Sequence, residues 1–190
     1  MRAERTDAEI IAASIEDPDV FEFVFDRHYD AVRRYLQRRV GLDVGEELAA
    51  QTFLIAFDRR ANYDARYPSA KPWLLGIATN LLRHHLRDER IRLAAYAKAP
   101  VGQINPEGTD DDRLAAALAA PRIAEVLMTL HQRDRDAFLL FVVGELSYEE
   151  VAVALGIPSG TVRSRLNRAR RKMREQLEGL EAIQGMAEQG

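Results

Sequence analysis

Apolar residues recur at helical spacing along most of the chain, and this periodicity constrains the fold more than any other feature. No runs of alternating β-branched residues joined by Asn-Gly hairpin turns interrupt it. With 190 residues, the chain is long enough to form two small hydrophobic cores. We therefore expect an all-α protein built from two small helical domains.

Caps and helix-ending residues divide the chain into two groups of helices. The first group is expected at residues 7–15, 20–40, 44–58 and from Pro72 onward, with Asp19 and the pair Asp43 and Glu46 as caps. The second group is expected at residues 121–130, 133–143, 148–155 and 159–177. Residues 98–120 contain prolines, glycines and an acidic cluster, a composition typical of a flexible linker. The predicted organisation is an N-terminal domain at 1–97, the linker at 98–120 and a C-terminal domain at 121–190, each domain with its own core.

The composition excludes several classes of protein. Because the chain has no cysteine, disulfides, thiolate catalysis and Cys-ligated zinc are excluded. No apolar run approaches the roughly 20 residues that a membrane span needs, so membrane insertion is not expected. The first twenty residues carry acids and lack the continuous apolar stretch of a secretory signal, which predicts a cytoplasmic location.

Positive charge is concentrated near the C-terminus, although the formal net charge of the chain is −3. Residues 159–174 contain six arginines and one lysine and no acidic residue. Such a run indicates a polyanionic partner such as nucleic acid.

The basic run follows the sequence pattern of a helix-turn-helix. Ser147 and Glu150 form a capping box, Gly156 ends that helix, and Ser159 begins the next one. One face of the second helix carries Val162, Leu166, Ala169, Met173 and Leu177, and the opposite face carries Arg163, Ser164, Asn167, Arg168 and Arg171. In the major groove, Arg bonds guanine and Asn bonds adenine bidentately, so this face has the chemistry of a recognition helix. The alternative is a solvated basic helix.

The segment GELSYEEVAVALGIPSGTVRSRLNRARRKMREQL, at residues 144–177, resembles the region-four domain of bacterial extracytoplasmic-function (ECF) sigma factors. In that family this domain reads the minus-35 promoter element. The resemblance implies that Arg163, Asn167 and Arg168 face bases, with Ser164 on the same face, and that Thr161, Arg165 and Arg171 contact phosphates.

Three N-terminal segments resemble region two of the same family, in the same order and spacing: FEFVFDRHYDAVRRYLQRRVG, EELAAQTFLIAF and WLLGIATNLLRHHLR. The resemblance implies a promoter-specificity subunit that binds the β′ and β subunits of core RNA polymerase and promoter DNA, with no catalysis and no cofactor of its own. It also implies an anti-sigma factor as a partner.

The helix at 44–58 is apolar on several sides, so it needs more than one surface to bury it. By resemblance, its polymerase-facing residues are Glu47, Leu48, Gln51 and Leu54. The chain has Ala50 and Gln51 where the family usually has Gln and Glu. For Phe53 we expect burial in the domain core.

The family resemblance also implies that the loop before the third helix opens the minus-10 element and holds an extruded base. An extruded base needs hydrogen bonds to its edge and packing on its faces. The residues with suitable side chains are Asn62, Tyr63, Asp64, Arg66 and Tyr67 in the loop, and Asn80 on the helix. Asn80 as an ordinary surface residue is the alternative, and Trp73 is expected to anchor the core.

Two other functions are weaker fits to the sequence. A conventional transcription regulator needs a ligand-sensing or receiver domain in place of residues 20–98, and no β/α pattern is present there. An enzyme would have to use His28, His84, His85 or His131, and no HExxH, nucleophile elbow or phosphate loop accompanies them. Because His84 and His85 diverge by about 100° on a helix, no metal site is expected.

Overall fold

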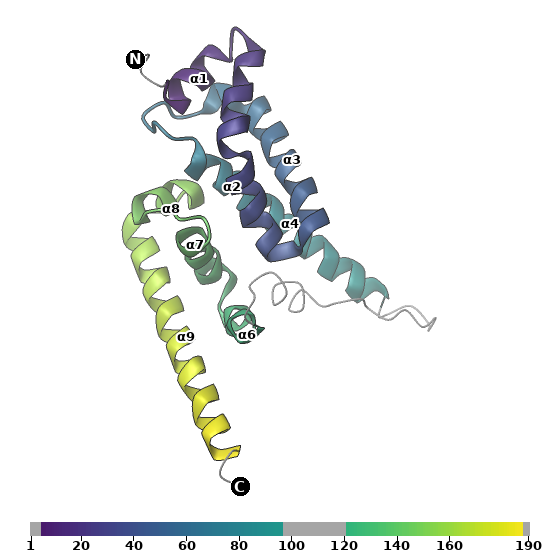
Figure 1. Ribbon diagram of the computed structural model, residues 1–190, viewed down its shortest axis with the longest axis vertical. Coiled ribbons are helices and arrows are strands. Elements are labelled where there is room, and N and C mark those ends of the chain that lie inside the picture. Colours follow the sequence, from purple (N-terminus) through teal and green to yellow (C-terminus); the bar gives the residue numbers. More distant parts are fainter. Residues whose placement is uncertain (1–4, 97–120, 188–190) are drawn as a thin grey trace.

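The computed structural model describes residues 5–96 and 121–187, with side chains at 5–92 and 125–176, and the described residues form only helices and their connections (Figure 1). The elements are α1 (Asp7–Ala13), η1 (Pro18–Phe21), α2 (Glu22–Val40), α3 (Leu42–Arg59), η2 (Arg60–Asn62), α4 (Lys71–Tyr96), α6 (Pro121–Thr129), α7 (Gln132–Val142), α8 (Tyr148–Leu155) and α9 (Ser159–Ala187). The all-α prediction is confirmed. None of the described helices is both long and apolar enough to cross a membrane. The expected linker at 98–120 lies outside the described residues.

Local sequence determines both ends of α8, as predicted. The Ser147 hydroxyl accepts a hydrogen bond from the Glu150 backbone N–H at 3.2 Å, and the Glu150 carboxylate accepts one from the Ser147 N–H at 2.8 Å. Gly156 ends the helix in the left-handed region, with φ at 62°, where glycine is favoured. The capping box and the glycine stop are therefore confirmed.

Two other expected caps are wrong. α3 begins at Leu42, directly after Gly41, and no side-chain hydrogen bond caps it, so Asp43 lies inside its first turn. Asp19 likewise lies inside the 3-10 turn η1, not at an N-cap. Both acids still lie near the N-terminus of a helix, where a negative charge interacts favourably with the helix dipole.

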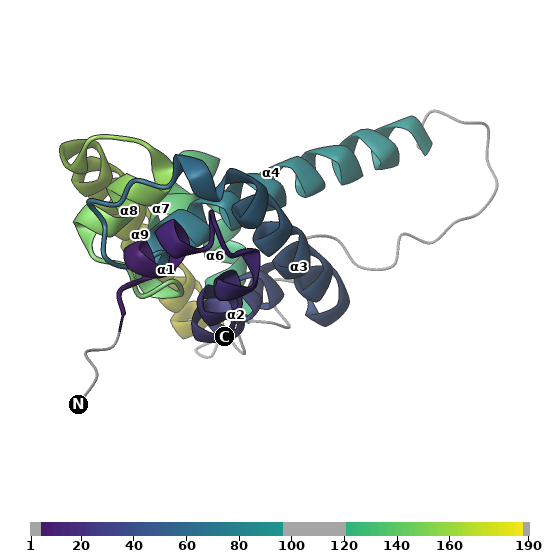
Figure 2. The ribbon, with the colours of Figure 1, turned by 90° about the horizontal axis from the view of Figure 1, so that it is seen from above.

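The N-terminal domain is a bundle of α2, α3 and α4, with α1 packed against α2 and η2 (Figure 1). Its core includes Val24, Val32, Leu36, Val40, Leu48, Ala49, Phe53, Ala56, Leu74, Ala78 and Leu82. In the view from above, the second half of α4 projects away from the other helices (Figure 2).

The C-terminal domain packs α6, α7 and α8 against α9. Val162, Leu166 and Ala169 of α9 are completely buried, and Met173 packs against the same core. The predicted apolar stripe is therefore confirmed over these four positions, and the side chain of Leu177 lies outside the described ones.

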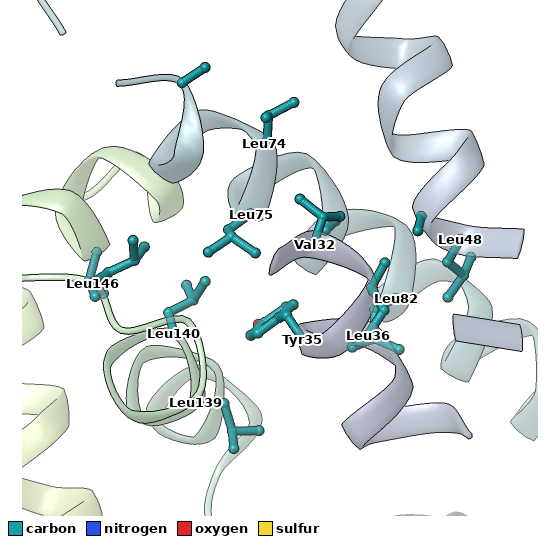
Figure 3. Packing of buried hydrophobic residues seen from close by; sticks show 14 of the residues in the cluster. Val32, Tyr35, Leu36, Leu48, Leu74, Leu75, Leu82, Leu139, Leu140 and Leu146 are labelled. Atoms are coloured by element: carbon teal, nitrogen blue, oxygen red, sulfur yellow. The ribbon is translucent and has the colours of Figure 1, made fainter. Parts of the chain in front are cut away.

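The cores of the two domains are continuous, which corrects the expectation of two separate cores. Tyr35 and Leu75 of the N-terminal domain lie opposite Leu140 and Leu146 of the C-terminal domain, and all four side chains are buried (Figure 3). α4 packs along α8 in the same interface. The two helical domains predicted from sequence are present, but they are packed against one another.

Three charged side chains meet where the domains touch. Asp136 of α7 is completely buried, and its carboxylate accepts hydrogen bonds from Arg39 Nη2 at 2.9 Å and Arg83 Nε at 2.7 Å. Arg39 also donates to the Tyr35 hydroxyl at 2.9 Å. Burial opposes the charge on Arg39, but Tyr35 and Asp136 outweigh it and raise the pKa of the guanidinium. A buried, paired carboxylate therefore joins the C-terminal domain to α2 and α4.

The approach of α4 to α8 depends on the absence of a side chain at Gly76. A Cβ atom at this position would clash with the backbone carbonyl oxygen of Ala154 on α8. Because a backbone atom cannot rotate away as a flexible side chain does, relieving such a clash requires α4 and α8 to move apart.

We expect Gly76→Ala to weaken the contact between the domains even though it favours the helix. Alanine in a helix interior is more stable than glycine by roughly 0.5–1 kcal/mol, but its methyl group here meets the backbone of α8. Small-angle X-ray scattering should show a larger radius of gyration than wild type, with unchanged helix content by circular dichroism. Gly160→Ala is the matched control, because a Cβ there meets nothing within 4 Å. An unchanged radius for Gly76→Ala would contradict the expectation.

Candidate nucleic-acid interface

The outer face of α9 is the largest group of polar residues singled out from the sequence. Since Val162, Leu166 and Ala169 point into the core, the opposite side chains of Arg163, Ser164, Asn167, Arg168 and Arg171 are exposed, as expected. Thr161 and Arg165 lie at the edge of this face and are half-buried. The capped helix α8 and the turn after Gly156 hold α9 in a helix-turn-helix arrangement.

Several of these side chains are held by neighbours that the sequence did not reveal. Arg168 donates two hydrogen bonds to Asp134 of α7, Nε at 3.1 Å and Nη2 at 2.8 Å. The Ser164 hydroxyl donates to the Gly160 carbonyl oxygen at 3.0 Å, one turn earlier on the same helix. Arg171 is exposed and lies 3.8 Å from Glu175, an ordinary surface pair.

Positive charge extends beyond α9 onto neighbouring helices. Burial lowers the pKa of Arg165, Asp134 opposes that shift, and the nearby charges of Arg133 and Arg83 add to it. Arg83 belongs to α4 and Arg133 to α7, so residues far apart in sequence share one electrostatic environment. The sequence did not indicate Arg83 and Arg133, because its run of positive charge is confined to one helix.

The candidate minus-10 residues lie in the connection before α4 and on α4 itself. Asn62, Arg66, Tyr67 and Asn80 are exposed, whereas Tyr63 and Asp64 are half-buried. Hydrogen bonds within the loop order it, among them Tyr63 hydroxyl to Tyr67 carbonyl oxygen at 2.6 Å, Arg66 Nη2 to Asp64 Oδ2 at 2.6 Å, and Arg66 Nε to Asp64 Oδ1 at 2.9 Å. On α4, the amide oxygen of Asn80 accepts a hydrogen bond from Arg83 Nη1 at 3.2 Å.

Tyr63 is the anchor of this loop. Its ring packs on Trp73, with ring centroids 5.1 Å apart, and Trp73 in turn packs against the core as expected. Burial, together with the charges of Asp7 and Asp64, raises the pKa of Tyr63 to about 12. The Tyr63 hydroxyl is therefore protonated, and it donates a hydrogen bond to the Tyr67 carbonyl oxygen.

The residues assigned to polymerase binding divide into two groups. Glu47 and Leu54 are exposed, Leu54 at 66%, and half-buried Gln51 donates to Glu47 Oε1 at 3.1 Å. These three follow at intervals of four and three residues, so they share one face of α3. Leu48 is only 4% exposed and lies in the domain core, so its assignment to a contact surface is corrected.

Aromatic residues extend the exposed side of α2 and α3. Phe53 is buried, as expected, and its ring contacts Phe25 at a centroid distance of 4.9 Å. Phe25 stacks on Tyr29 at a centroid distance of 4.6 Å and is partly exposed. Phe25 therefore lies at the edge of the domain core, between Phe53 and solvent.

The four histidines lie apart from any common site, each in a different environment. His28 is buried and lies 2.6 Å from Asp7, the His131 ring accepts a hydrogen bond from the Arg133 N–H, and His85 lies 3.6 Å from Glu89. His84 is exposed. In the described parts of the chain, no group of three His, Asp or Glu side chains could hold a metal ion.

Two family models match the chain in the order expected from its sequence. The model of Sigma-70 region 2 matches residues 24–91, and the model of Sigma-70, region 4 matches residues 121–173. These segments cover α2 to α4 and α6 to the first half of α9, which carry all of the candidate residues.

Curated relatives match over most of their length. RNA polymerase sigma factor CarQ of Myxococcus xanthus is 33% identical over 175 residues, which cover 86% of this chain and 92% of CarQ. ECF RNA polymerase sigma factor SigM of Mycobacterium tuberculosis is 31% identical over 176 residues, which cover 90% of this chain and 85% of SigM. ECF RNA polymerase sigma factor SigE of Mycolicibacterium smegmatis is 36% identical over 158 residues, 80% of this chain but 59% of SigE.

Two solved structures share the fold. CnrH, in complex with the cytosolic domain of CnrY, has a TM-score of 0.65 at 22% identity, covering 91% of this chain and 97% of CnrH. Sigma factor RpoE of Bartonella quintana, in complex with the anti-sigma factor NepR, has a TM-score of 0.61 at 21% identity, covering 83% of this chain and 96% of RpoE.

Since both sigma regions match in order and the relatives agree, the chain belongs to the ECF sigma factors, non-catalytic proteins that direct promoter-specific transcription initiation by RNA polymerase.

Proposed function

We propose that the C-terminal domain reads the minus-35 element with α9 and that the N-terminal domain opens the minus-10 element. The single observation that supports this most is the exposed polar face of α9, opposite three fully buried apolar residues in a capped helix-turn-helix. Arg163, Asn167 and Arg168 would face base edges from this surface. Thr161, Arg165 and Arg171 would contact phosphates around them.

For the minus-10 element, the proposed contacts come from the loop before α4 and from Asn80. The exposed side chains of Asn62, Arg66 and Tyr67 offer hydrogen bonds and a stacking face to a base that has left the duplex. Tyr63 and Asp64 would hold these side chains in place, because Tyr63 bonds the backbone of Tyr67 and Asp64 pairs with Arg66. A cytoplasmic location belongs to the same proposal, since bacterial promoters and polymerase are found there.

Transcription in a purified system tests this division of labour. The full-length chain is mixed with core RNA polymerase and genomic DNA, and the 5′ ends of the transcripts are mapped. We expect starts that share two upstream sequence elements at fixed distances from the start site. Transcripts indistinguishable from those of core polymerase alone would overturn the proposal.

The polymerase-binding surface is proposed to be the face of α3 that carries Glu47, Gln51 and Leu54. Leu54 is the strongest candidate for an anchor, because a 66% exposed leucine contributes little to the fold of the free protein. By resemblance, its partner is the coiled coil of the β′ subunit.

We expect Leu54→Ala to weaken binding to core polymerase by about tenfold, as truncation of an interface anchor does, with little change in melting temperature. The matched control is Ile91→Ala, which removes a similarly exposed apolar side chain from α4. Binding is measured by titrating labelled protein with core polymerase. Equal affinities for Leu54→Ala and wild type would place the polymerase surface elsewhere.

An anti-sigma factor is proposed as a second partner. It is supported by the bound state of the structurally similar RpoE, which was solved with the anti-sigma factor NepR. Exposed Phe23, Phe25 and Leu54 give this chain apolar surface for a protein partner. Affinity capture from the native cell should recover, apart from polymerase, one protein that blocks transcription when added to the purified system. Capture of polymerase subunits alone would contradict this part of the proposal.

A further inference from the structure

Asp7, the first residue of α1, is a buried carboxylate that connects three segments of the chain. Its side chain is only 2% exposed. Oδ2 lies 2.6 Å from His28 Nε2 of α2 and accepts a hydrogen bond from the backbone N–H of Ala70 at 2.7 Å. Oδ1 pairs with the guanidinium of Arg27, also on α2. The backbone N–H of Asp7 donates to the Pro68 carbonyl oxygen at 3.0 Å.

Two of these contacts fix the end of the candidate minus-10 loop. Pro68 and Ala70 are the last part of that loop before α4 begins at Lys71. Asp7 holds one through its backbone and the other through its side chain, so the two contacts together determine both the position and the direction of the chain there. A single hydrogen bond would leave rotation about that bond free.

The other end of α1 holds the start of the same loop. Arg60, in the turn η2 at the start of the loop, donates from Nε to the Ser14 carbonyl oxygen at 3.2 Å and from Nη1 to the Phe57 carbonyl oxygen at 2.6 Å. Ser14 is the C-cap of α1. The helix therefore spans the loop and contacts it at both ends.

The carboxylate of Asp7 is both buried and charged, which is a costly combination in a protein interior. Burial disfavours the charged carboxylate, yet the hydrogen bonds from His28 and the Ala70 N–H outweigh that effect and lower its pKa below the ordinary value. A buried carboxylate is retained only where several donors meet it, and removing it leaves those donors unpaired. An arrangement of this kind holds its neighbours in one geometry and not in several.

We propose that Asp7 is a positioning residue for minus-10 recognition: by holding Pro68 and Ala70 against α1, its carboxylate keeps Arg66 and Tyr67 in the geometry that receives the extruded base. The inference rests on the proposed role of this loop. Asp7 itself is buried beneath the loop and does not touch DNA. Its effect is therefore on selectivity for the minus-10 sequence, and binding of polymerase and of the minus-35 element is independent of it.

The test uses holoenzyme assembled from the full-length chain and core polymerase. The probes are two labelled single strands carrying the non-template sequence of a mapped promoter, one with its minus-10 bases intact and one with them replaced. We expect Asp7→Ala to reduce the ratio of the two affinities by about tenfold, because displacement of binding groups by an ångström has effects of this size or larger. Affinity for core polymerase and for a minus-35 duplex should stay as in wild type.

Two further variants separate positioning from loss of structure. Asp30→Ala is the matched control, because it removes an exposed carboxylate of α2 that pairs with Arg33 three residues away, and it should leave the ratio unchanged. Asp7→Asn keeps an oxygen that can accept the Ala70 N–H, so it should restore much of the ratio lost in Asp7→Ala. Hydrogen exchange should be faster in peptides covering residues 63–72 of Asp7→Ala and unchanged in α8.

The outcomes distinguish this inference from the function on which it rests. If Asp7→Ala keeps the wild-type ratio while Tyr67→Ala loses it, the loop reads the minus-10 element but Asp7 does not position it. If the wild-type holoenzyme binds both strands equally, the minus-10 role of the loop itself is wrong. If Asp7→Ala weakens both strands and the minus-35 duplex by one factor, the carboxylate is only structural and the inference is overturned.

Discussion

Replacing Asp136 by alanine is expected to separate the two domains of the free protein while each domain keeps its helices. The wild-type carboxylate is completely buried and bonded to Arg39 and Arg83, and the Arg39 side chain is only 6% exposed. Removing one partner of a buried ion pair costs about 3–5 kcal/mol, because a charge is left buried without compensation. The variant can avoid this cost by opening the interface, which returns both guanidinium groups to water.

Small-angle X-ray scattering of the free protein measures this opening as an increase in the radius of gyration. Asp134→Ala is the matched control, since Asp134 lies two residues away on α7 but pairs with Arg168 of its own domain. The control should keep the wild-type radius. An Asp136→Ala protein with an unchanged radius and only a lower melting temperature would show that the interface does not open.

The same variant is expected to bind core polymerase and promoter DNA more readily. A compact chain of this length has a radius of gyration of about 16 Å, whereas elements at minus-10 and minus-35 are about 85 Å apart along DNA at 3.4 Å per base pair. With its domains packed together, the protein therefore cannot reach both elements. In wild type, the free energy needed to open the interface reduces the apparent affinity for promoter DNA. Arg83 donates hydrogen bonds both to Asp136 and to the candidate minus-10 residue Asn80, so opening removes Asp136 from the surroundings of that residue.

Local signals in the sequence were sufficient to predict several elements. Ser147, Glu150 and Gly156 lie within ten residues of one another, and each determines its own hydrogen bond or backbone angle whatever the rest of the chain does. The buried and exposed faces of α9 were predictable in the same way, because its apolar residues recur with a clear helical period. These elements, and the exposed face that they present, could be predicted from the amino-acid sequence alone.

Contacts between distant segments could not be predicted in this way. Arg39 and Asp136 are 97 positions apart, and neither has a neighbour that marks it as a partner of the other. Gly76 in an apolar helix gives no sign that the backbone of α8 lies against it. Because α3 has apolar residues on several sides, its sequence does not show which leucine is buried. In the structure Leu48 is buried in the core and Leu54 is exposed.

The minus-35 proposal makes a separate prediction that distinguishes base reading from charge attraction. Arg163 lies in the first turns of α9, and Asn167 follows one turn later on the same exposed face. Recognition helices contact base edges with their N-terminal residues, and positions further along lie closer to the backbone. Arg171 is such a position, and its side chain is exposed and paired only loosely with Glu175. Arg168 is already held by Asp134, so Arg163 is the cleaner choice for a base-reading residue.

We expect Arg163→Ala to cost about 1–3 kcal/mol of binding free energy on the cognate minus-35 sequence and much less on scrambled DNA, because a bidentate contact to a base is lost. Arg171→Ala should weaken both sequences by similar factors and reduce the salt dependence of binding by about one unit, as loss of one phosphate contact does. Holoenzyme is titrated with matched and scrambled duplexes over a series of salt concentrations, since the DNA-reading faces act together only when the domains are open. The two variants serve as controls for each other, because each removes one arginine from the same helix face. If both lose equal affinity on both duplexes, α9 supplies only positive charge, and sequence reading at minus-35 must come from another part of the chain.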